Sequence, residues 1–184
     1  MASTLSVSKI QGLATAASPT TVEIASGHKI SGAAGSIVAP GQVIQVQHAN
    51  FSSQISTTSS TIAATGIQMN FTPHIATSKL LVRFNIQGVY NATASSGWNF
   101  YVYRDGSAVT EDGLHSSGMF VYAIGYSTGE DIDEVSNEVL LSANNTNQTL
   151  IALYGRIYNA GTSYINVNAA SGDRSFMTIM ERAQ

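Results

Sequence analysis

Apolar residues recur at every second position over most of this chain, and that spacing is typical of β-strands with one buried face. In residues 79–90, Leu80, Val82 and Phe84 alternate with a second set that is mostly polar. The same spacing predicts further strands over residues 67–71, 98–103, 119–124, 150–158, 164–167 and 176–180. Turn-forming residues separate them at Pro40-Gly41, Arg104-Asp105-Gly106, Asp112-Gly113, Asn159-Ala160-Gly161 and Ser171-Gly172-Asp173.

One segment, residues 132–141, fits two patterns. Ile132, Val135 and Val139 fall at helical spacing after an acidic start. Val135, Val139 and Leu141 also alternate in the manner of a strand. We interpret the segment as a strand, and the rest of the chain also points to β-structure.

The sequence therefore predicts an all-β chain in two parts. Residues 41–184 have the regular strand spacing of an antiparallel β-sandwich or jelly roll. The apolar residues within 1–40 are too few and too dispersed to form a core in one chain. Because Val22 and Ile24 alternate like a short strand, we interpret residues 1–40 as an extended attachment or shaft segment that needs partners. A disordered tail is the alternative.

Charge is scarce in the first part of the chain. Between Ser3 and Ser78 the only formal charges are Lys9, Glu23 and Lys29, whereas about a quarter of the residues of a soluble protein are usually charged. We infer that copies of the same chain cover this surface. The 8 Lys and Arg residues of the whole chain are scattered and its net charge is −3, which predicts no binding of nucleic acid.

Two predicted strands are apolar on both faces. In residues 98–103, Tyr101 and Tyr103 stand opposite the face that carries Trp98, and residues 176–180 leave almost no polar side. A strand of a two-layer sandwich in water has one buried face, so a neighbouring subunit is the simplest cover for the second face. A loop of the same chain is the alternative cover. The predicted oligomer interface comprises Val22, Ile24, Tyr101, Tyr103, Phe176, Met177, Ile179 and Met180.

The sequence shows no export or membrane signal. No stretch of about 18 apolar residues occurs, so we expect no membrane insertion. The first residues lack the basic leader and apolar centre of a secretory signal. Cys is absent, which excludes disulfides and thiolate metal sites.

Candidate catalytic and metal sites are weak. Residues 125–129 match the G-x-S-x-G string of a nucleophile elbow, but an acidic stretch follows and no triad partner is placed by the sequence. The acidic residues at 130–134 lack the ligand order of a calcium loop. The four His residues are isolated, so a metal would need one His from each of several copies. We expect no catalytic residue, no bound metal and no cofactor.

Aromatic and imidazole side chains at predicted loop margins are the candidate contacts for a surface ligand, because they offer a large contact area at low entropic cost. The candidates are Trp98, Tyr90, Tyr126 and His115. Each has an alternative interpretation as ordinary packing, since most Trp and Tyr side chains are at least partly buried.

Short motifs distributed along the chain carry a family resemblance. They are Leu5-Ser-Val-Ser-Lys-Ile-Gln, Thr21-Val-Glu-Ile-Ala-Ser-Gly, Pro40-Gly-Gln-Val-Ile-Gln-Val, Ser59-Ser-Thr-Ile-Ala-Ala-Thr-Gly-Ile, Phe71-Thr-Pro, Ser78-Lys-Leu-Leu-Val and the closing Phe176-Met-Thr-Ile-Met-Glu. Together they resemble small tail-fibre or virion-fibre proteins of tailed phages, notably cyanophages and other aquatic phages.

The resemblance implies a homotrimeric fibre whose C-terminal jelly-roll knob is similar to the C1q and tumour-necrosis-factor heads. It implies that residues 1–40 contact other virion proteins and that the knob contacts a receptor on the host surface, for which a glycan is the candidate. Such a virion is assembled in the host cytoplasm and released by lysis, in agreement with the lack of an export signal. Because residues 1–40 are short for a long tail fibre, a head fibre, a capsid decoration protein or a baseplate appendage also fits. A polysaccharide-degrading spike enzyme is the alternative from another class, and such enzymes usually need clustered carboxylates.

Overall fold

The computed structural model describes Ser26 and residues 38–92, 96–111, 119–125, 133–159 and 161–184, of which 119–125 and 133 are described by their backbone alone. The chain divides into two units, Met1–Ile37 and Val38–Gln184. Apart from Ser26 the first unit lies outside the described residues, and so do the interface residues predicted at Val22 and Ile24.

Strands account for nearly all regular structure in the described part of the second unit. The strands are β1 (Val43–Phe51), β2 (Ile55–Thr57), β3 (Ala63–Phe71), β4 (Lys79–Asn91), β5 (Ser96–Arg104), β6 (Ser107–Ala108), β7 (Met119–Gly125), β8 (Asp133–Ser142), β9 (Thr149–Ile157), β10 (Ser163–Ile165) and β11 (Ser175–Arg182), with a 3₁₀ turn at Ala169–Ser171. The strand predicted within 132–141 is confirmed as β8.

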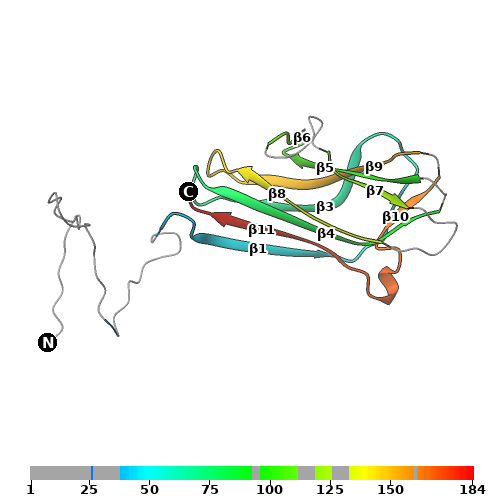
Figure 1. Cartoon of the computed structure of the whole chain (residues 1–184), viewed down its shortest axis with the longest axis horizontal. Coiled ribbons are helices and arrows are strands. Elements are labelled where there is room, and N and C mark those ends of the chain that lie inside the picture. Colours follow the sequence, from blue (N-terminus) through cyan, green and yellow to red (C-terminus); the bar gives the residue numbers. More distant parts are fainter. Residues whose placement is uncertain (1–25, 27–37, 93–95, 112–118, 126–132, 160) are drawn as a thin grey trace. The chain divides into compact units, whose positions relative to one another are not determined.

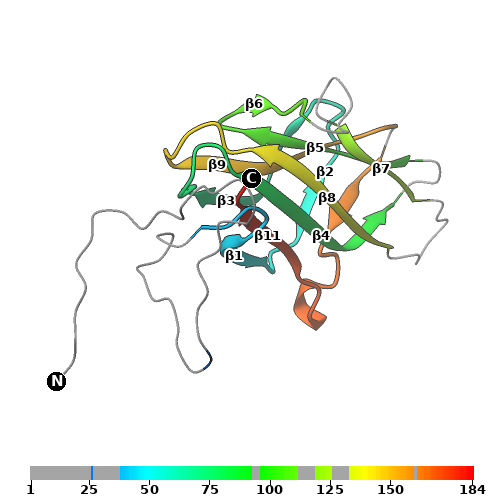
Figure 2. The ribbon, with the colours of Figure 1, turned by 60° about the vertical axis from the view of Figure 1, so that its left-hand side comes forward.

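Two antiparallel sheets form a sandwich, as the alternation predicts (Figures 1 and 2). The first sheet has the order β1-β11-β4-β10-β2, with β8 also paired to β4, and the second has the order β3-β9-β5-β6, with β7 also paired to β5. Without the three-residue and two-residue strands, the long strands run β1-β11-β4-β8 and β3-β9-β5-β7. That order is a jelly roll, in which chain neighbours mostly belong to opposite sheets.

The core lies between the sheets and consists of the inward residues of the alternating strands. Leu80, Val82 and Phe84 of β4 are fully buried, and each such side chain contributes about 1.5–3 kcal/mol by leaving water. Trp98 stacks on Phe100 with ring centroids 5.3 Å apart, and its indole N–H donates to a backbone carbonyl 3.1 Å away. Trp98 and Phe100 therefore belong to the core between the sheets.

The turn at Asp105-Gly106 has the predicted conformation. Both residues have positive φ angles, 49° and 79°, which a two-residue type I′ hairpin requires. The backbone N–H of Leu150 and the hydroxyl of Thr149 donate to the Asp105 carboxylate at 2.8 Å each. These hydrogen bonds lower the pKa of Asp105 and tie the hairpin to the start of β9.

The sequence patterns missed β1 and β2. In β1 the residues that pair with inward positions of β11 include Gln45 and Gln47, while the outward Val46 is 52% exposed. Polar and apolar positions are thus inverted relative to an ordinary half-buried strand. β2 has only three residues, too few for a period to be read.

In the part of the chain that the structure describes, no helix has the length and apolar character needed to cross a membrane.

Gly88, the one glycine of β4, is predicted to tolerate no side chain. Its φ is +58°, and a Cβ added there would collide with the Asp173 carboxylate and lie 2.8 Å from the Val167 nitrogen. We expect Gly88→Ala to destabilise the fold by more than the about 1–2 kcal/mol that a left-handed backbone costs. Urea unfolding measures this cost. Gly41→Ala is the control, because Gly41 has a φ of +80° with nothing within 4 Å, and equal losses in the two variants would contradict the predicted collision.

Candidate interaction surface

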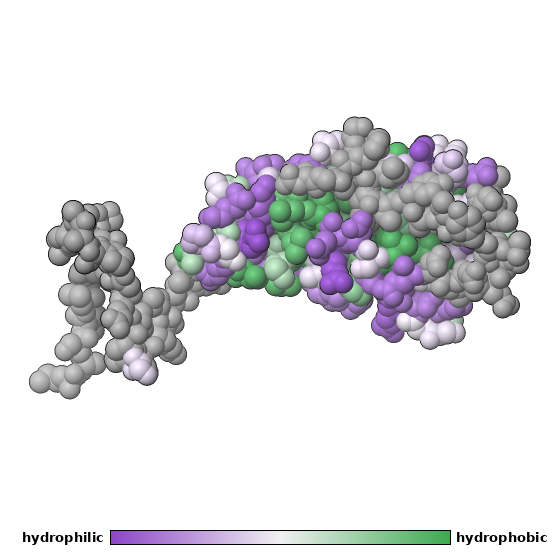
Figure 3. Space-filling view, viewed as in Figure 1, coloured by the Kyte–Doolittle hydropathy of each residue, from purple (hydrophilic) through white to green (hydrophobic). Residues whose placement is uncertain are grey.

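The outer face of the first sheet carries a row of apolar side chains, one from each long strand. The strand register places them side by side in the order Val46, Met180, Leu81 and Leu140. Val46 is exposed and the other three are half-buried, and none of the four belongs to the core. Figure 3 shows hydrophobic surface interrupting hydrophilic surface on the side where β8, β4, β11 and β1 lie in Figure 1. A solvated sheet face is usually polar, so this apolar row is the candidate interaction surface.

Charged side chains border the apolar row on both sides. On one side Arg182 of β11 pairs in register with Lys79 of β4. On the other side Arg83 of β4 lies between Thr178 of β11 and Glu138 of β8. An apolar centre inside a polar and charged rim is the usual anatomy of a protein interface.

Further exposed apolar residues gather at the start of β1. Val38 and Val43 are 45% and 44% exposed. With Val46 they are three of the four large hydrophobic residues that are exposed within the described part of the chain. Val38 and Val43 therefore form a second exposed apolar area, at the beginning of the edge strand β1.

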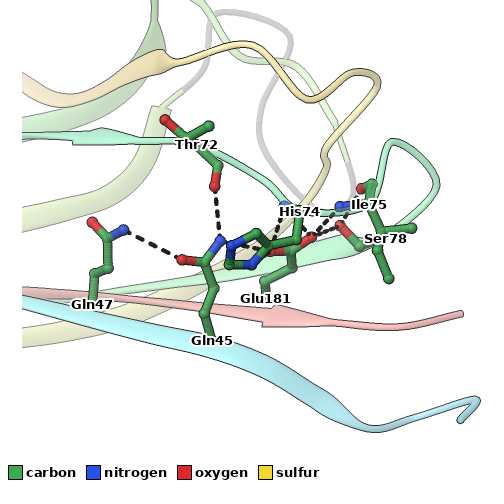
Figure 4. A network of polar contacts seen from close by, with 7 residues as sticks. All are labelled: Gln45, Gln47, Thr72, His74, Ile75, Ser78 and Glu181. Atoms are coloured by element: carbon green, nitrogen blue, oxygen red, sulfur yellow. Dashed lines mark hydrogen bonds and ion pairs between the residues drawn. The ribbon is translucent and has the colours of Figure 1, made fainter. Parts of the chain in front are cut away.

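A buried carboxylate, that of Glu181, lies on the inner face of the first sheet, where β11 pairs with the beginning of β1. Glu181 is fully buried and accepts hydrogen bonds from the backbone N–H groups of His74 and Ile75, both at 2.9 Å. The Gln45 amide and the Ser78 hydroxyl also donate to it, each at 2.7 Å (Figure 4). A charged group withstands burial when it is hydrogen-bonded in this way.

These hydrogen bonds decide the ionisation of Glu181. Burial by itself raises the pKa of the carboxyl group, but the donors of His74, Gln45, Ser78 and Ile75 lower the pKa by more than burial raises it. The pKa therefore lies below its ordinary value, and the group stays charged in the folded protein at neutral pH. The His74 imidazole lies 3.7 Å from the carboxylate.

The network extends from Glu181 to the edge strand. The Gln45 amide also donates to the Thr72 carbonyl at 2.8 Å, and the Gln47 amide lies 3.4 Å from the Gln45 side-chain oxygen. These contacts join β1, β11 and the connection between β3 and β4. Val46 lies between the two Gln residues, so the network holds it on the outward face. The burial of Glu181 could have been found from the sequence, because Glu181 follows Met177 and Ile179 at every second position of the strand and so faces inward with them.

The predicted oligomer interface is partly wrong. Met177 and Ile179 are 0% exposed and belong to the core, because β11 alternates and its inward residues fill the sandwich. Phe176 and Met180 have the opposite parity and are half-buried on the outer face. Only Met180 lies in the apolar row.

The tyrosine residues of β5 take different positions. Tyr101 is 2% exposed in the single chain, so its burial requires no neighbouring subunit, and the Arg156 guanidinium lies 5.8 Å from its ring centroid. Tyr103 is half-buried and stacks on Tyr154 with centroids 3.9 Å apart. The interpretation that a partner must cover both residues is wrong for Tyr101.

The predicted receptor contacts are not brought together. Trp98 is 1% exposed and lies within β5, so it packs in the core and not at an exposed loop margin, and its role as a receptor contact stays a prediction. Tyr90 is half-buried, with its ring 5.8 Å from that of Tyr164. Tyr126 and His115 lie outside the described residues.

The weaker candidate sites lie mostly outside the described residues as well. Only Gly125 of the G-x-S-x-G string is described, and of the acidic segment 130–134 only Glu134 has a described side chain. Among the described residues, no three His, Asp or Glu side chains are grouped closely enough to hold a metal ion. The His48 ring contacts the Thr178 hydroxyl at 2.9 Å.

No protein-family model matches the chain, and no curated protein matches it. Among solved structures the chain is similar to the VP2 subviral particle of infectious bursal disease virus, with a TM-score of 0.34 and 10% identity over 85% of this chain. The similar region covers 42% of that chain. These values are too low to support a function, so the function proposed below rests on the chain's own surfaces.

Glu181→Gln is predicted to destabilise the fold by about 2–3 kcal/mol at neutral pH, because four donor groups lose a charged acceptor. The folded pKa is lowered, so the contribution of the carboxylate is complete above the unfolded pKa of about 4.3 and disappears as the pH falls through the folded value. The difference between wild type and variant should therefore shrink on acidification. Urea unfolding at neutral and acidic pH measures it. Glu138→Gln, at an exposed position of β8, is the control and should change stability little; a pH-independent difference at Glu181 would contradict the assignment.

Proposed function

We propose that this chain is a non-enzymatic structural component of a phage particle, namely a short trimeric tail fibre whose β-sandwich contacts the host surface. The observation that supports it is the apolar row on the outer face of the first sheet. Exposed apolar surface in a sandwich with a polar rim favours a protein partner. The scarcity of charge before Ser78 favours a further copy of this chain as that partner.

A ring of copies accounts for the two apolar areas better than a face-to-face pair. The row that contains Met180 lies on the sheet face, whereas Val38 and Val43 lie at the start of the edge strand. If the face of one copy packs against the edge of the next, the contact is heterologous, and heterologous contacts form a ring when the rotation between copies closes. Three copies make the smallest such ring.

The arrangement suits attachment by several weak contacts. A ring presents the same surface three times on one rigid body, so three weak contacts gain avidity without a deep pocket. Residues 1–40 would then attach the ring to other proteins of the particle. A head fibre or a capsid decoration protein would use the same ring, and the location of the chain on the particle distinguishes them from a tail fibre.

The double change Met180→Gln with Leu81→Gln is predicted to convert the assembly into monomers, because it places two amides in the centre of the apolar row. Sedimentation equilibrium at micromolar concentration measures the mass, and circular dichroism checks the fold. Ser136→Gln is the control, since Ser136 is exposed on the same face of β8 but lies outside the row. A monomeric wild type, or a double variant that keeps the wild-type mass, would refute self-association through this row.

Particle imaging tests the location. We expect a reconstruction of the phage to place this chain at the tail in threefold groups, and we expect added purified chain to reduce adsorption of the phage to its host. Copies found on the capsid lattice would identify a decoration protein instead. If the purified chain released reducing sugars from host polysaccharide, the non-enzymatic part of the proposal would be wrong.

A further inference from the structure

An uncharged groove runs along the side of the sandwich where the edges of the two sheets face each other. One hollow, of about 390 Å³, is lined by Asn50, Phe51, Ser52, Ser53, Ile55, Thr65 and Gly66. A second, of about 240 Å³, is lined by Ile55, Ser56, Thr57, Ala63, Ala64, Thr65, Trp98 and Gly155. The two hollows share Ile55 and Thr65 in their linings, so they adjoin, and together they are called the groove below. The larger one falls within the usual range of small-molecule sites, about 300–1,000 Å³.

The fold keeps this groove open. β2 and β3 are the last strands of their sheet orders, so no further strand fills the space between them within the described part of the chain. The register of β3 shifts between Ala64 and Gln68, where Gly66 has a φ of +84° and nothing within 4 Å of an added Cβ. The Thr65 hydroxyl holds this bulge by donating to the Leu153 carbonyl at 2.8 Å. Bulges of this kind redirect a strand edge and are common beside binding sites.

The lining selects an uncharged ligand. None of the residues that line the two hollows carries a charge. An ionic ligand would lose hydration there without meeting an opposite charge, which is costly. The groove therefore disfavours phosphate, sialic acid and uronic acid groups.

The lining also disfavours a purely apolar ligand. Ser52, Ser53 and Ser56 are exposed along the rim, and a ligand that covers their hydroxyls without bonding to them would leave polar groups unsatisfied. The half-buried Phe51 and Ile55 supply an apolar floor. A ligand with an apolar ring face and hydroxyl groups at its edge fits both parts of the groove.

We propose that this groove binds a neutral oligosaccharide. The inference rests on the proposed function, for which it names the chemical class of the host receptor. Trp98 then has a role that its burial alone does not suggest: its buried side chain lines the second hollow, close to Gly155. It contributes apolar contact there, because its indole N–H already donates to the Tyr164 carbonyl.

The chain carries one Trp, so fluorescence of Trp98 reports directly on this groove. The probes are maltohexaose, cellohexaose, chitohexaose and mannohexaose, with a hyaluronan hexasaccharide as the anionic comparison, each titrated into the full chain. We expect a saturable change with at least one neutral probe at a Kd of about 1 mM or below and no change with hyaluronan. Absence of any response up to about 10 mM of every neutral probe, or an equal response to hyaluronan, would overturn the proposal.

Matched variants test the location. Ala63→Arg places a long charged side chain in the groove and should weaken binding by about tenfold or more, whereas Gln68→Arg, an exposed position of the same strand that does not line either hollow, should bind like wild type. Unchanged binding by Ala63→Arg would overturn the proposal. So would a change in assembly mass on Ala63→Arg without any sugar binding, because the groove would then hold protein from a neighbouring copy.

The outcome is separable from that of the proposed function. Assembly mass and competition for phage adsorption are measured without any added sugar. A wild-type trimer that competes for adsorption but binds no neutral probe refutes the groove alone. A chain that binds sugar as a monomer and does not compete refutes the fibre and supports the groove.

Discussion

The hydrogen-bonded carboxylate of Glu181 secures the register of the first sheet, and both faces of that sheet depend on the register. A slip of one residue in β11 would move Met177 and Ile179 out of the core and bring Met180 in. The same slip would take the carboxylate away from the His74 and Ile75 N–H groups. Hydrophobic burial and charge satisfaction therefore favour one pairing, and that pairing also assembles the apolar row on the outside.

Much of the fold could be predicted because apolar and polar residues alternate strongly in strands that have one buried and one solvent-exposed face. β4 and β9 and the Asp105-Gly106 hairpin were predicted on this basis, and the choice of strand over helix for 132–141 was correct as well. The local sequence was sufficient to locate these elements, because the apolar period and the turn residues indicate the same strand boundaries. The all-β sandwich followed from them.

The surface could be predicted only in part, because its elements depend on pairing between distant segments. Gln45 points inward to serve a carboxylate 136 positions away, so β1 has an inverted pattern that a period of two does not reveal. Met180 was placed in the interface, but its partners in the row, Leu81 and Leu140, become visible only when the register is known. Trp98 was misplaced because a large aromatic residue near a turn suits both a loop margin and a core.

The way in which the chain enters β1 has a mechanical consequence. The backbone of Gly41 and Gln42 is hydrogen-bonded to Ala183, and β1 then continues along β11 for most of its length. A pull applied at Val38 along the axis of β1 would load this ladder in shear, with its hydrogen bonds sharing the force in parallel. The whole strand pair would resist such a pull at once, where a pull across the strands would break one bond after another.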